Sequence, residues 1–465
     1  MTPTNLCDLN ATELVRRIHC REISAVEVLQ AHLERIEQRN PALNALVTLV
    51  PEQALKCAQA LDAALARGED PGPLAGLPVA HKDLALTKGI RTTFGSPLFQ
   101  DFVPNQNALI VERMQAAGAV TLGKTNTPEF GAGSQTFNRV FGATRNPYDL
   151  SKTCGGSSGG AAVALATGMI ALADGSDMGG SLRNPASFCH VVGLRPSPGR
   201  VPIWPTQNLW QSLSVEGPMG RTPQDVALLL SVISGPDARV ANSISESGSL
   251  FRQPLERDFR GVRVAWSPTW GGLPMEPSVV ATLASQRKAL EALGCIVEDA
   301  DPDLHDAEEA FSVLRAWSFA MGMAIHYNRP EERAQLKDTI IWNIEAGLKL
   351  SSAEIGRAVQ AQSRLFENMH SFMQRYEFVL GPVSQVVPFP IEQPYVTNIH
   401  GVAMENYIAW MRSCYFISAT GHPALSVPGG FTTTGLPVGL QIVGRYRDEL
   451  GILQLGHALY TQAGF

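Results

Sequence analysis

The sequence predicts an α/β fold built around a sheet of buried strands. Short apolar runs that end in glycine or polar turns occur at LAGLPVAHKD, AGAVTLGKTN, GMIALADGSD and HVVGLRPS, and such runs are typical of strands. Several alternate with stretches that have helical spacing of apolar residues, such as ALIVERMQAAG. Neither an internal repeat nor a low-complexity linker interrupts the 465 residues, so we expect one large domain.

The first part of this domain is expected to be helical. Ser24 and Glu27 have the spacing of a capping box, and Asn40 and Pro41 are expected to stop the helix that follows. The pattern divides the single domain, residues 1–465, into a helical lead-in over 1–65, a core with the glycine-rich motifs over 66–235, a helical insertion over 303–376 and a return to the core sheet over 377–465.

Composition and charge exclude several classes of protein. With 37 Lys and Arg against 43 Asp and Glu, the net charge is -6 and the sequence has no lysine-rich run, so nucleic acid is not an expected partner. The seven cysteines form neither a CxxC pair nor a ligand-spaced cluster, which favours a reducing cytoplasm and argues against a structural metal. Neither a secretory h-region nor a bilayer-length apolar run is found, so no membrane partner is expected.

Two glycine-padded serine patches carry the strongest chemical signal. The first, CGGSSGG, matches G-x-S-x-G with Ser157 or Ser158 at its centre. The preceding RNPYDLSKT has the character of a loop, which disfavours the nucleophile elbow of an α/β-hydrolase. A phosphate-binding loop is excluded because no GK[ST] follows the glycines. The plain alternative is a Gly/Ser turn that starts a helix.

Chain geometry brings this patch close to the second one, DGSDMGGSLRN, at residues 174–184. A helix of about 11 residues from Ser158 onward covers roughly 16 Å, and the following MIALAD run returns about 20 Å as a strand. Ser157 and Ser181 can therefore meet. The glycines beside Ser181 permit close backbone approach, so that successive N–H groups can point at one oxygen and stabilise an oxyanion.

A serine nucleophile also needs a base, and the sequence offers two candidates. Lys82 ends the apolar run LAGLPVAHKD, so its ammonium is expected at a strand end among apolar neighbours, where desolvation lowers the pKa of an amine. A solvated surface lysine is the alternative at such a position. His190 opens the run HVVGL, which favours a strand-edge histidine over a general base.

Three segments resemble, in their order and spacing, the signature of a known family. VAHKD at 79–83, CGGSSGGAA at 154–162 and GSDMGGSLRNPA at 175–186 resemble the motifs of the amidase signature family. The resemblance extends over most of the chain, through GATRNPYD, VGLRPS, EGPMGRT, PALSVPGGF and GLPVGLQIVG. It implies an α/β fold with a large mixed central sheet covered by helices on both faces.

The resemblance implies a Ser-cisSer-Lys triad. Ser181 is implied to be the nucleophile that forms an acyl-enzyme, and Ser157, preceded by a cis peptide bond in relatives, bridges Ser181 and neutral Lys82 as a proton relay. This chemistry implies amide hydrolysis without a metal or an organic cofactor. A small-molecule amide is then the expected partner, and we expect a monomer or a homodimer.

Further residues receive roles by the same resemblance. The implied oxyanion hole consists of the backbone N–H groups of Met178, Gly179, Gly180 and Ser181, although many relatives have Thr in place of Met178. Ser158 either supports Lys82 through a hydrogen bond or caps a helix. Asp177 and Arg183 are expected to orient the nucleophile loop, with substrate contact as the less favoured role, and Gly131 is expected beside the substrate.

Aromatic and methionine side chains recur near these motifs and in the helical insertion, which is expected near the substrate entrance. They are Trp204, Trp210, Trp317, Phe319, Met321, Met323 and Trp342. We expect most of them in the core, and a few at the entrance would make a roomy, apolar pocket for aryl or alkyl amides, anilides or carbamates. Arg183 is the one evident cation for a substrate carboxylate, which disfavours small dicarboxylic substrates.

Three functions fit these residues. The favoured one is a stand-alone amidase whose acyl-enzyme chemistry extends to carbamates (urethanes). The second is the glutaminase component of a tRNA-dependent amidotransferase, its A subunit, which shares the core motifs and works with a partner. The third is a catalytically silent binding protein of the same fold, which intact Lys82, Ser157 and Ser181 argue against.

Overall fold

A computed structural model describes residues 5–464; residues 1–4, at the start of the expected helical lead-in, and residue 465 lie outside the described residues. The strands of the main sheet are β1 (Leu46–Leu49), β2 (Pro78–Lys82), β3 (Val120–Thr125), β6 (Leu172–Asp177), β7 (Val192–Arg195), β8 (Val215–Gly220), β9 (Arg263–Trp266), β10 (Ile296–Asp299), β11 (Phe378–Pro382), β14 (Ala424–Phe431) and β15 (Pro437–Gly444). Two short hairpins pair β4 (Phe137–Asn138) with β5 (Gly142–Ala143) and β12 (Asn398–Ile399) with β13 (Val402–Ala403).

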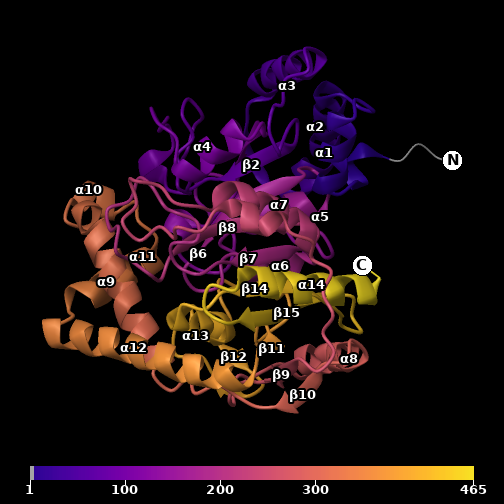
Figure 1. The fold of residues 1–465 in the computed structure, drawn as a ribbon. Helices are drawn as coiled ribbons and strands as arrows, with labels where there is room; N and C mark the ends of the chain where they lie inside the picture. The colour runs from indigo at the N-terminus through magenta and orange to yellow at the C-terminus, as the bar shows by residue number, and fades with distance from the viewer. Residues whose placement is uncertain (1–4, 465) are drawn as a thin grey trace.

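The main sheet has eleven strands in the order β1-β3-β2-β6-β8-β7-β14-β15-β11-β9-β10 and runs through the whole molecule (Figure 1). Strand β2 is parallel to both β3 and β6, and near the other end β9 is parallel to both β10 and β11. The pairs between these two groups, from β6–β8 to β15–β11, are antiparallel. The predicted α/β class with a large mixed sheet is therefore confirmed.

Helices cover both faces of this sheet or lie beside it. They are α1 (Ala11–His19), α2 (Ala25–Leu43), α3 (Pro51–Ala66), α4 (Leu109–Ala116), α5 (Gly159–Ala166), α6 (Arg183–Cys189), α7 (Pro223–Ile233), α8 (Pro277–Ala292), α9 (Ala307–Tyr327), α10 (Pro330–Arg333), α11 (Asp338–Leu348), α12 (Ser352–Arg375), α13 (Arg412–Thr420) and α14 (Glu449–Ala463).

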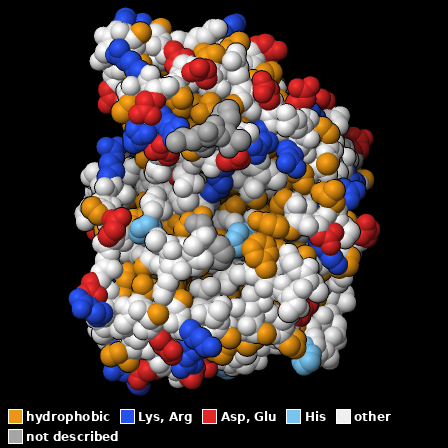
Figure 2. All heavy atoms as spheres, turned by 90° about the vertical axis from the view of Figure 1, so that its right-hand side faces the viewer, with side chains coloured by type: hydrophobic (Ala, Val, Ile, Leu, Met, Phe, Trp, Pro, Cys, Tyr) orange, Lys and Arg blue, Asp and Glu red, His pale blue; other side chains and the backbone are white. Residues whose placement is uncertain are grey.

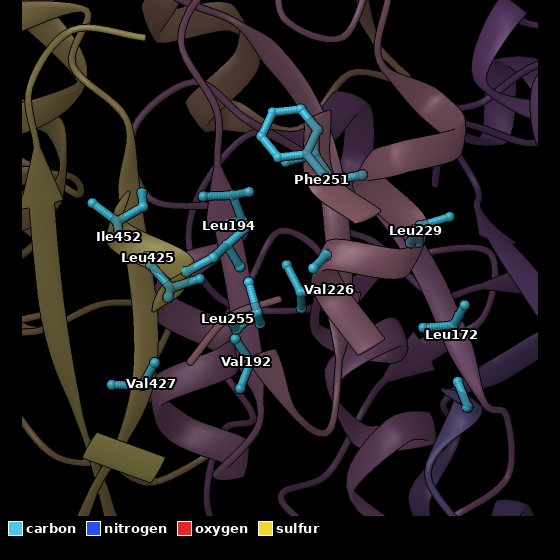
Figure 3. Packing of buried hydrophobic residues seen from close by; sticks show 14 of the residues in the cluster. Leu172, Val192, Leu194, Val226, Leu229, Phe251, Leu255, Leu425, Val427 and Ile452 are labelled. Atoms are coloured by element: carbon cyan, nitrogen blue, oxygen red, sulfur yellow. The ribbon is translucent and has the colours of Figure 1, made fainter. Parts of the chain in front are cut away.

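Alternate side chains of the strands enter different hydrophobic clusters, as the period of a strand requires. On β2, Val79 packs in a cluster with side chains of α1, α7 and α14, whereas Ala80 packs in one with side chains of α2, α3 and α5. Figure 3 shows part of the first cluster, in which Val226 of α7 and Ile452 of α14 lie near Leu194 of β7. The sheet is thus buried on both faces, which explains the short apolar runs of the sequence.

The lead-in departs from its prediction in two places. The capping box of Ser24 and Glu27 starts α2 as predicted, but the helix continues past Pro41 to Leu43. The helix tolerates this proline in its last turn, and it ends when Asn44 adopts a left-handed conformation, with φ at 53°. The segment is also not purely helical, because β1 pairs antiparallel with β3 and becomes an edge strand of the main sheet.

Residues 303–376 are the segment for which the sequence predicts a helical insertion. Residues 303–376 contain α9 to α12, which lie beside the sheet at the lower left of Figure 1. Within residues 5–464, none of the helices combines the length and apolarity that a bilayer span requires. On the face of the molecule in Figure 2, basic and acidic side chains are interspersed, and neither sign dominates.

Candidate active site

Lys82 lies at the end of β2, between β3 and β6, and is buried. Its Nζ donates to Ser157 Oγ at 2.7 Å, to Ser158 Oγ at 2.9 Å and to Ser176 Oγ at 3.0 Å. Burial lowers the pKa of Lys82 to about 7, against the opposing charges of three nearby carboxyl groups. A desolvated lysine, rather than a solvated surface charge, therefore stands at this strand end, as predicted.

The two serine patches meet, as the chain geometry predicts. Helix α5 is shorter than predicted because the chain turns at Gly168, which has a φ of 69°. Strand β6 then returns the chain, and the backbone N–H of Ser158 donates to the carbonyl oxygen of Ser181 at 3.1 Å. The peptide bond between Gly156 and Ser157 is cis. Ser157 and Ser181 line one cavity.

The sequence leaves two roles open for Ser158, support of Lys82 or helix capping, and the structure distinguishes them. Ser158 is the residue before α5, yet its side chain makes no capping hydrogen bond. Its hydroxyl contacts Lys82 Nζ instead. The turn that precedes it is held by Ser134, whose Oγ donates to the carbonyl oxygen of Gly156 at 2.6 Å.

A buried ion cluster supports the loop that carries Ser181. The Asp177 carboxylate accepts hydrogen bonds from Arg183 at 3.0 and 3.1 Å, and its Oδ1 lies 3.2 Å from Arg195 Nη1. Burial by itself would raise the pKa of Asp177, but the two guanidiniums hold it well below its usual range. Arg183 is fully buried and lies outside the residues that line the cavity, so it orients the loop and does not reach substrate.

The same carboxylate corrects one part of the predicted oxyanion hole. The N–H of Gly180 already donates to Asp177 Oδ1 at 2.8 Å, so Gly180 does not supply a donor to the cavity. Met178 and Gly179 line the cavity, as expected for this role. A Cβ at Gly179 would lie only 2.7 Å from Cζ of Phe311, so glycine is required there.

The cavity in front of these serines has a volume of about 110 Å³, so it is compact rather than roomy. Gly131 lies in its wall, where a Cβ would come within 3.4 Å of Ser157 Oγ, which agrees with its expected place beside the substrate. Helix α9 supplies Phe311, Arg315 and Phe319 to the cavity wall. Because these three are spaced by four residues, they lie on one face of the helix.

Most of the aromatic and methionine residues singled out in the sequence lie elsewhere. Of that set, Phe319 is the one that lines the cavity. Trp210, Trp317, Met321 and Trp342 are exposed, with 77%, 36%, 43% and 47% of their surface accessible. The expectation that most of the set lies in the core is therefore wrong. Trp317 and Met321 occupy a different face of α9 from Phe319, which explains their exposure.

Sequence reasoning missed two residues of the site. Ser176 contacts Lys82. Arg315 is the charged side chain of the cavity wall, a role for which the sequence analysis considered Arg183 instead. A signal for Arg315 is present, because it is the single basic residue of the apolar stretch FSVLRAWSFAMGMA. His190 lies outside the cavity wall, where it stacks on Phe431 and burial lowers its pKa to about 4, so the preference for Lys82 is supported.

Known proteins resemble this chain over nearly its whole length. A family model described as Amidase matches residues 27–453. An acylamidase from Rhodococcus erythropolis is 34% identical over 460 residues, covering 98% of this chain and 95% of the relative. The A subunit of the glutamyl-tRNA(Gln) amidotransferase from Methylococcus capsulatus is also 34% identical, covering 97% of this chain and 96% of the relative.

A similar solved structure agrees with these relatives. The crystal structure of a bacterial aryl acylamidase of the amidase signature family superposes with a TM-score of 0.92 at 29% identity, covering 98% of this chain and 96% of that one. The family model, the relatives and this structure all include the part of the chain that holds Lys82 and both serine patches. This chain belongs to the amidase signature family and is an amidase.

Proposed function

We propose that this protein is a stand-alone amidase that hydrolyses small aryl or alkyl amides, anilides and carbamates through an acyl-enzyme on Ser181. One observation carries the proposal: the buried amine of Lys82 lies 2.7 Å from Ser157 Oγ, and Ser157 shares the cavity with Ser181. A buried amine with a pKa near neutrality and two hydroxyl groups are the parts of a proton relay.

In the first half of the reaction, Ser181 Oγ attacks the carbonyl carbon of the bound amide. Its proton passes to Ser157 Oγ while the proton of Ser157 passes to neutral Lys82. The same relay then returns a proton to the leaving nitrogen, the C–N bond breaks, and the acyl group stays on Ser181 as an ester. Water then attacks the ester carbonyl and gives a proton to the relay. The bond between the acyl carbon and Ser181 Oγ breaks, the relay returns that proton to Ser181 Oγ, and the acid is released. Carbamates follow the same steps, because they present the same carbonyl carbon.

The negative charge on the carbonyl oxygen needs backbone donors during both halves. We assign this role to the N–H groups of Met178, Gly179 and Ser181, because Gly180 is engaged with Asp177. Asp177 in turn is fixed by Arg183 and Arg195, so the loop is organised before substrate binds. Such preorganised donors contribute about 3–4 kcal/mol to transition-state stabilisation in comparable enzymes.

A hydrolysis panel tests this proposal. The purified chain is assayed with 4-nitroanilides, short aliphatic amides, aryl carbamates and glutamine, with the Ser181→Ala protein as the blank. We expect cleavage of anilides or amides by the chain alone, and a covalent adduct of Ser181 with phenylsulfonyl fluoride. An unreactive Ser181 would favour the catalytically silent binding protein.

The second candidate function is the glutaminase component, or A subunit, of a tRNA-dependent amidotransferase. It is favoured by the relative from Methylococcus capsulatus, whose identity to this chain equals that of the acylamidase. The same panel separates the two functions. Hydrolysis of glutamine alone, dependent on added partner subunits, would replace the stand-alone amidase with this function.

A further inference from the structure

Arg315 differs from the other buried arginines of residues 5–464. Arg183 and Arg195 both pair with the Asp177 carboxylate, and Arg200 pairs with Glu449. Arg315 is buried as well, yet among the described residues it has no carboxylate within ion-pair distance. A buried cation without a counter-ion is costly, so its presence calls for a compensating partner.

Neutral groups hold the Arg315 guanidinium in place. Its Nη2 donates to the Tyr407 hydroxyl at 2.6 Å, and its Nη1 donates to the side-chain oxygen of Asn343. The guanidinium carbon also lies 4.7 Å from the ring centroid of Phe319 and 5.4 Å from that of Tyr407. These contacts fix its orientation and leave its positive charge uncompensated.

The uncompensated charge faces the reaction site. Arg315 and Ser181 line the same cavity, and among the residues that line it Arg315 is the one with a formal charge. Much of the remaining wall is apolar, with Leu84, Phe130 and Ile408 among its members. In such surroundings a guanidinium binds a carboxylate strongly, since water screens the pair little and two parallel hydrogen bonds can form.

We infer that Arg315 binds a carboxylate of the substrate while the scissile amide lies at Ser181. This inference rests on the proposed function and names its substrate class: small amides that carry one carboxylate, on either the acyl or the amine side. The compact cavity, of about 110 Å³, favours a short connection between the two groups. The sequence analysis disfavoured dicarboxylic substrates because Arg183 was the one evident cation for a substrate carboxylate. Arg315 supplies such a cation in the cavity wall, so that argument no longer applies.

Matched substrate pairs test the inference. On the acyl side, succinyl 4-nitroanilide is compared with its neutral methyl ester; on the amine side, 4-acetamidobenzoate is compared with acetanilide. We expect the wild type to prefer the carboxylate member of at least one pair by about 100-fold in kcat/KM, mostly through KM. Arg315→Met should abolish this preference, because it slows the carboxylate member far more than the neutral member.

A structural role of Arg315 makes a different prediction. If the side chain only ties α9 to Asn343 and Tyr407, Arg315→Met would slow the charged and neutral members equally, and that result would overturn the inference. Arg315→Lys keeps the charge without the planar fork, so it should retain part of the preference. Arg364→Met is the matched control, because Arg364 bonds Asp306 at the start of α9, outside the cavity, and should leave both pairs unchanged.

A binding measurement separates this inference from the proposed function. Calorimetry in the Ser181→Ala background compares the affinities for the two members of each substrate pair, with and without Arg315→Met. The inference is supported if the carboxylate member binds more tightly and Arg315→Met removes this advantage. It is supported even if the wild type cleaves neither member, because absence of cleavage counts against the proposed function alone. Equal binding of both members of each substrate pair overturns the inference. Circular dichroism and melting temperature confirm that each variant is folded.

Discussion

Two regions of the molecule build the cavity, and they differ in how their side chains are held. The sheet side contributes Lys82 from the end of β2 and Ser181 from the loop after β6, and both are buried. Lys82 Nζ contacts three serine hydroxyls, and the carbonyl oxygen of Ser181 accepts from the backbone N–H of Ser158. The helical insertion contributes one face of α9, while a different face of the same helix exposes Trp317 and Met321. Under the proposed function, the sheet side provides the chemistry and the insertion selects the substrate.

The largest expected effect comes from the sheet side. Ser181→Ala removes the nucleophile and should lower kcat/KM for an amide substrate by at least about 10⁴-fold. The melting temperature should change little. Ser363→Ala, which removes an exposed hydroxyl from α12 of the insertion, is the matched control and should keep full activity. Retention of more than a tenth of the wild-type rate by Ser181→Ala would contradict the division between the two regions.

Stability should follow the same division. Arg183→Met breaks a fully buried ion pair with Asp177, and we expect the free energy of unfolding to fall by about 3–5 kcal/mol. Arg364→Met breaks an exposed pair with Asp306 on the insertion, and here we expect a much smaller loss, since solvent screens the pair. Urea denaturation of the two variants checks this order. Equal losses would show that the insertion is as tightly organised as the sheet side.

The pH dependence locates the titrating base. Burial lowers the pKa of Lys82 to about 7, so the reactive neutral amine predominates above this pH. The value of kcat/KM should therefore fall about tenfold per pH unit below about 7 and level off above it. Burial also lowers the pKa of Lys337, in the insertion, to about 8. Lys337→Met should leave the midpoint unchanged, and a displaced midpoint would place the titration in the insertion.

The smallest effects should distinguish the two faces of α9. Phe319→Ala enlarges the cavity and should raise KM about tenfold with kcat within about threefold, since a wall contact contributes to binding. Trp317→Ala removes an exposed ring, and both constants should stay within about twofold of the wild type. Steady-state kinetics with one anilide measure both variants. A larger effect at Trp317 would mean that the exposed face of α9 also takes part in substrate selection.

Several features of the fold followed from local patterns in the sequence. The capping box of Ser24 and Glu27 marked a helix start, because this signal depends on residues three positions apart. Short apolar runs marked β2, β3, β6 and β7, because strands covered on both faces need apolar side chains throughout. The helix end beyond Pro41 and the edge strand β1 were missed, since both depend on packing partners elsewhere in the chain.

The motif residues Lys82, Ser157 and Ser181 could be identified from the sequence alone. The same is true of the short helix and strand that bring the two serines together. The tertiary structure was needed to show which cation faces the cavity. Arg183 and Arg315 are the same residue type, and they differ only in the partners that the fold gives them. Arg183 is neutralised by a carboxylate six residues away, whereas the rotation of α9 against its neighbouring helices α11, α12 and α13 turns Arg315 inward and Trp317 outward. Helix rotation depends on packing over the whole interface, and a local pattern does not contain it.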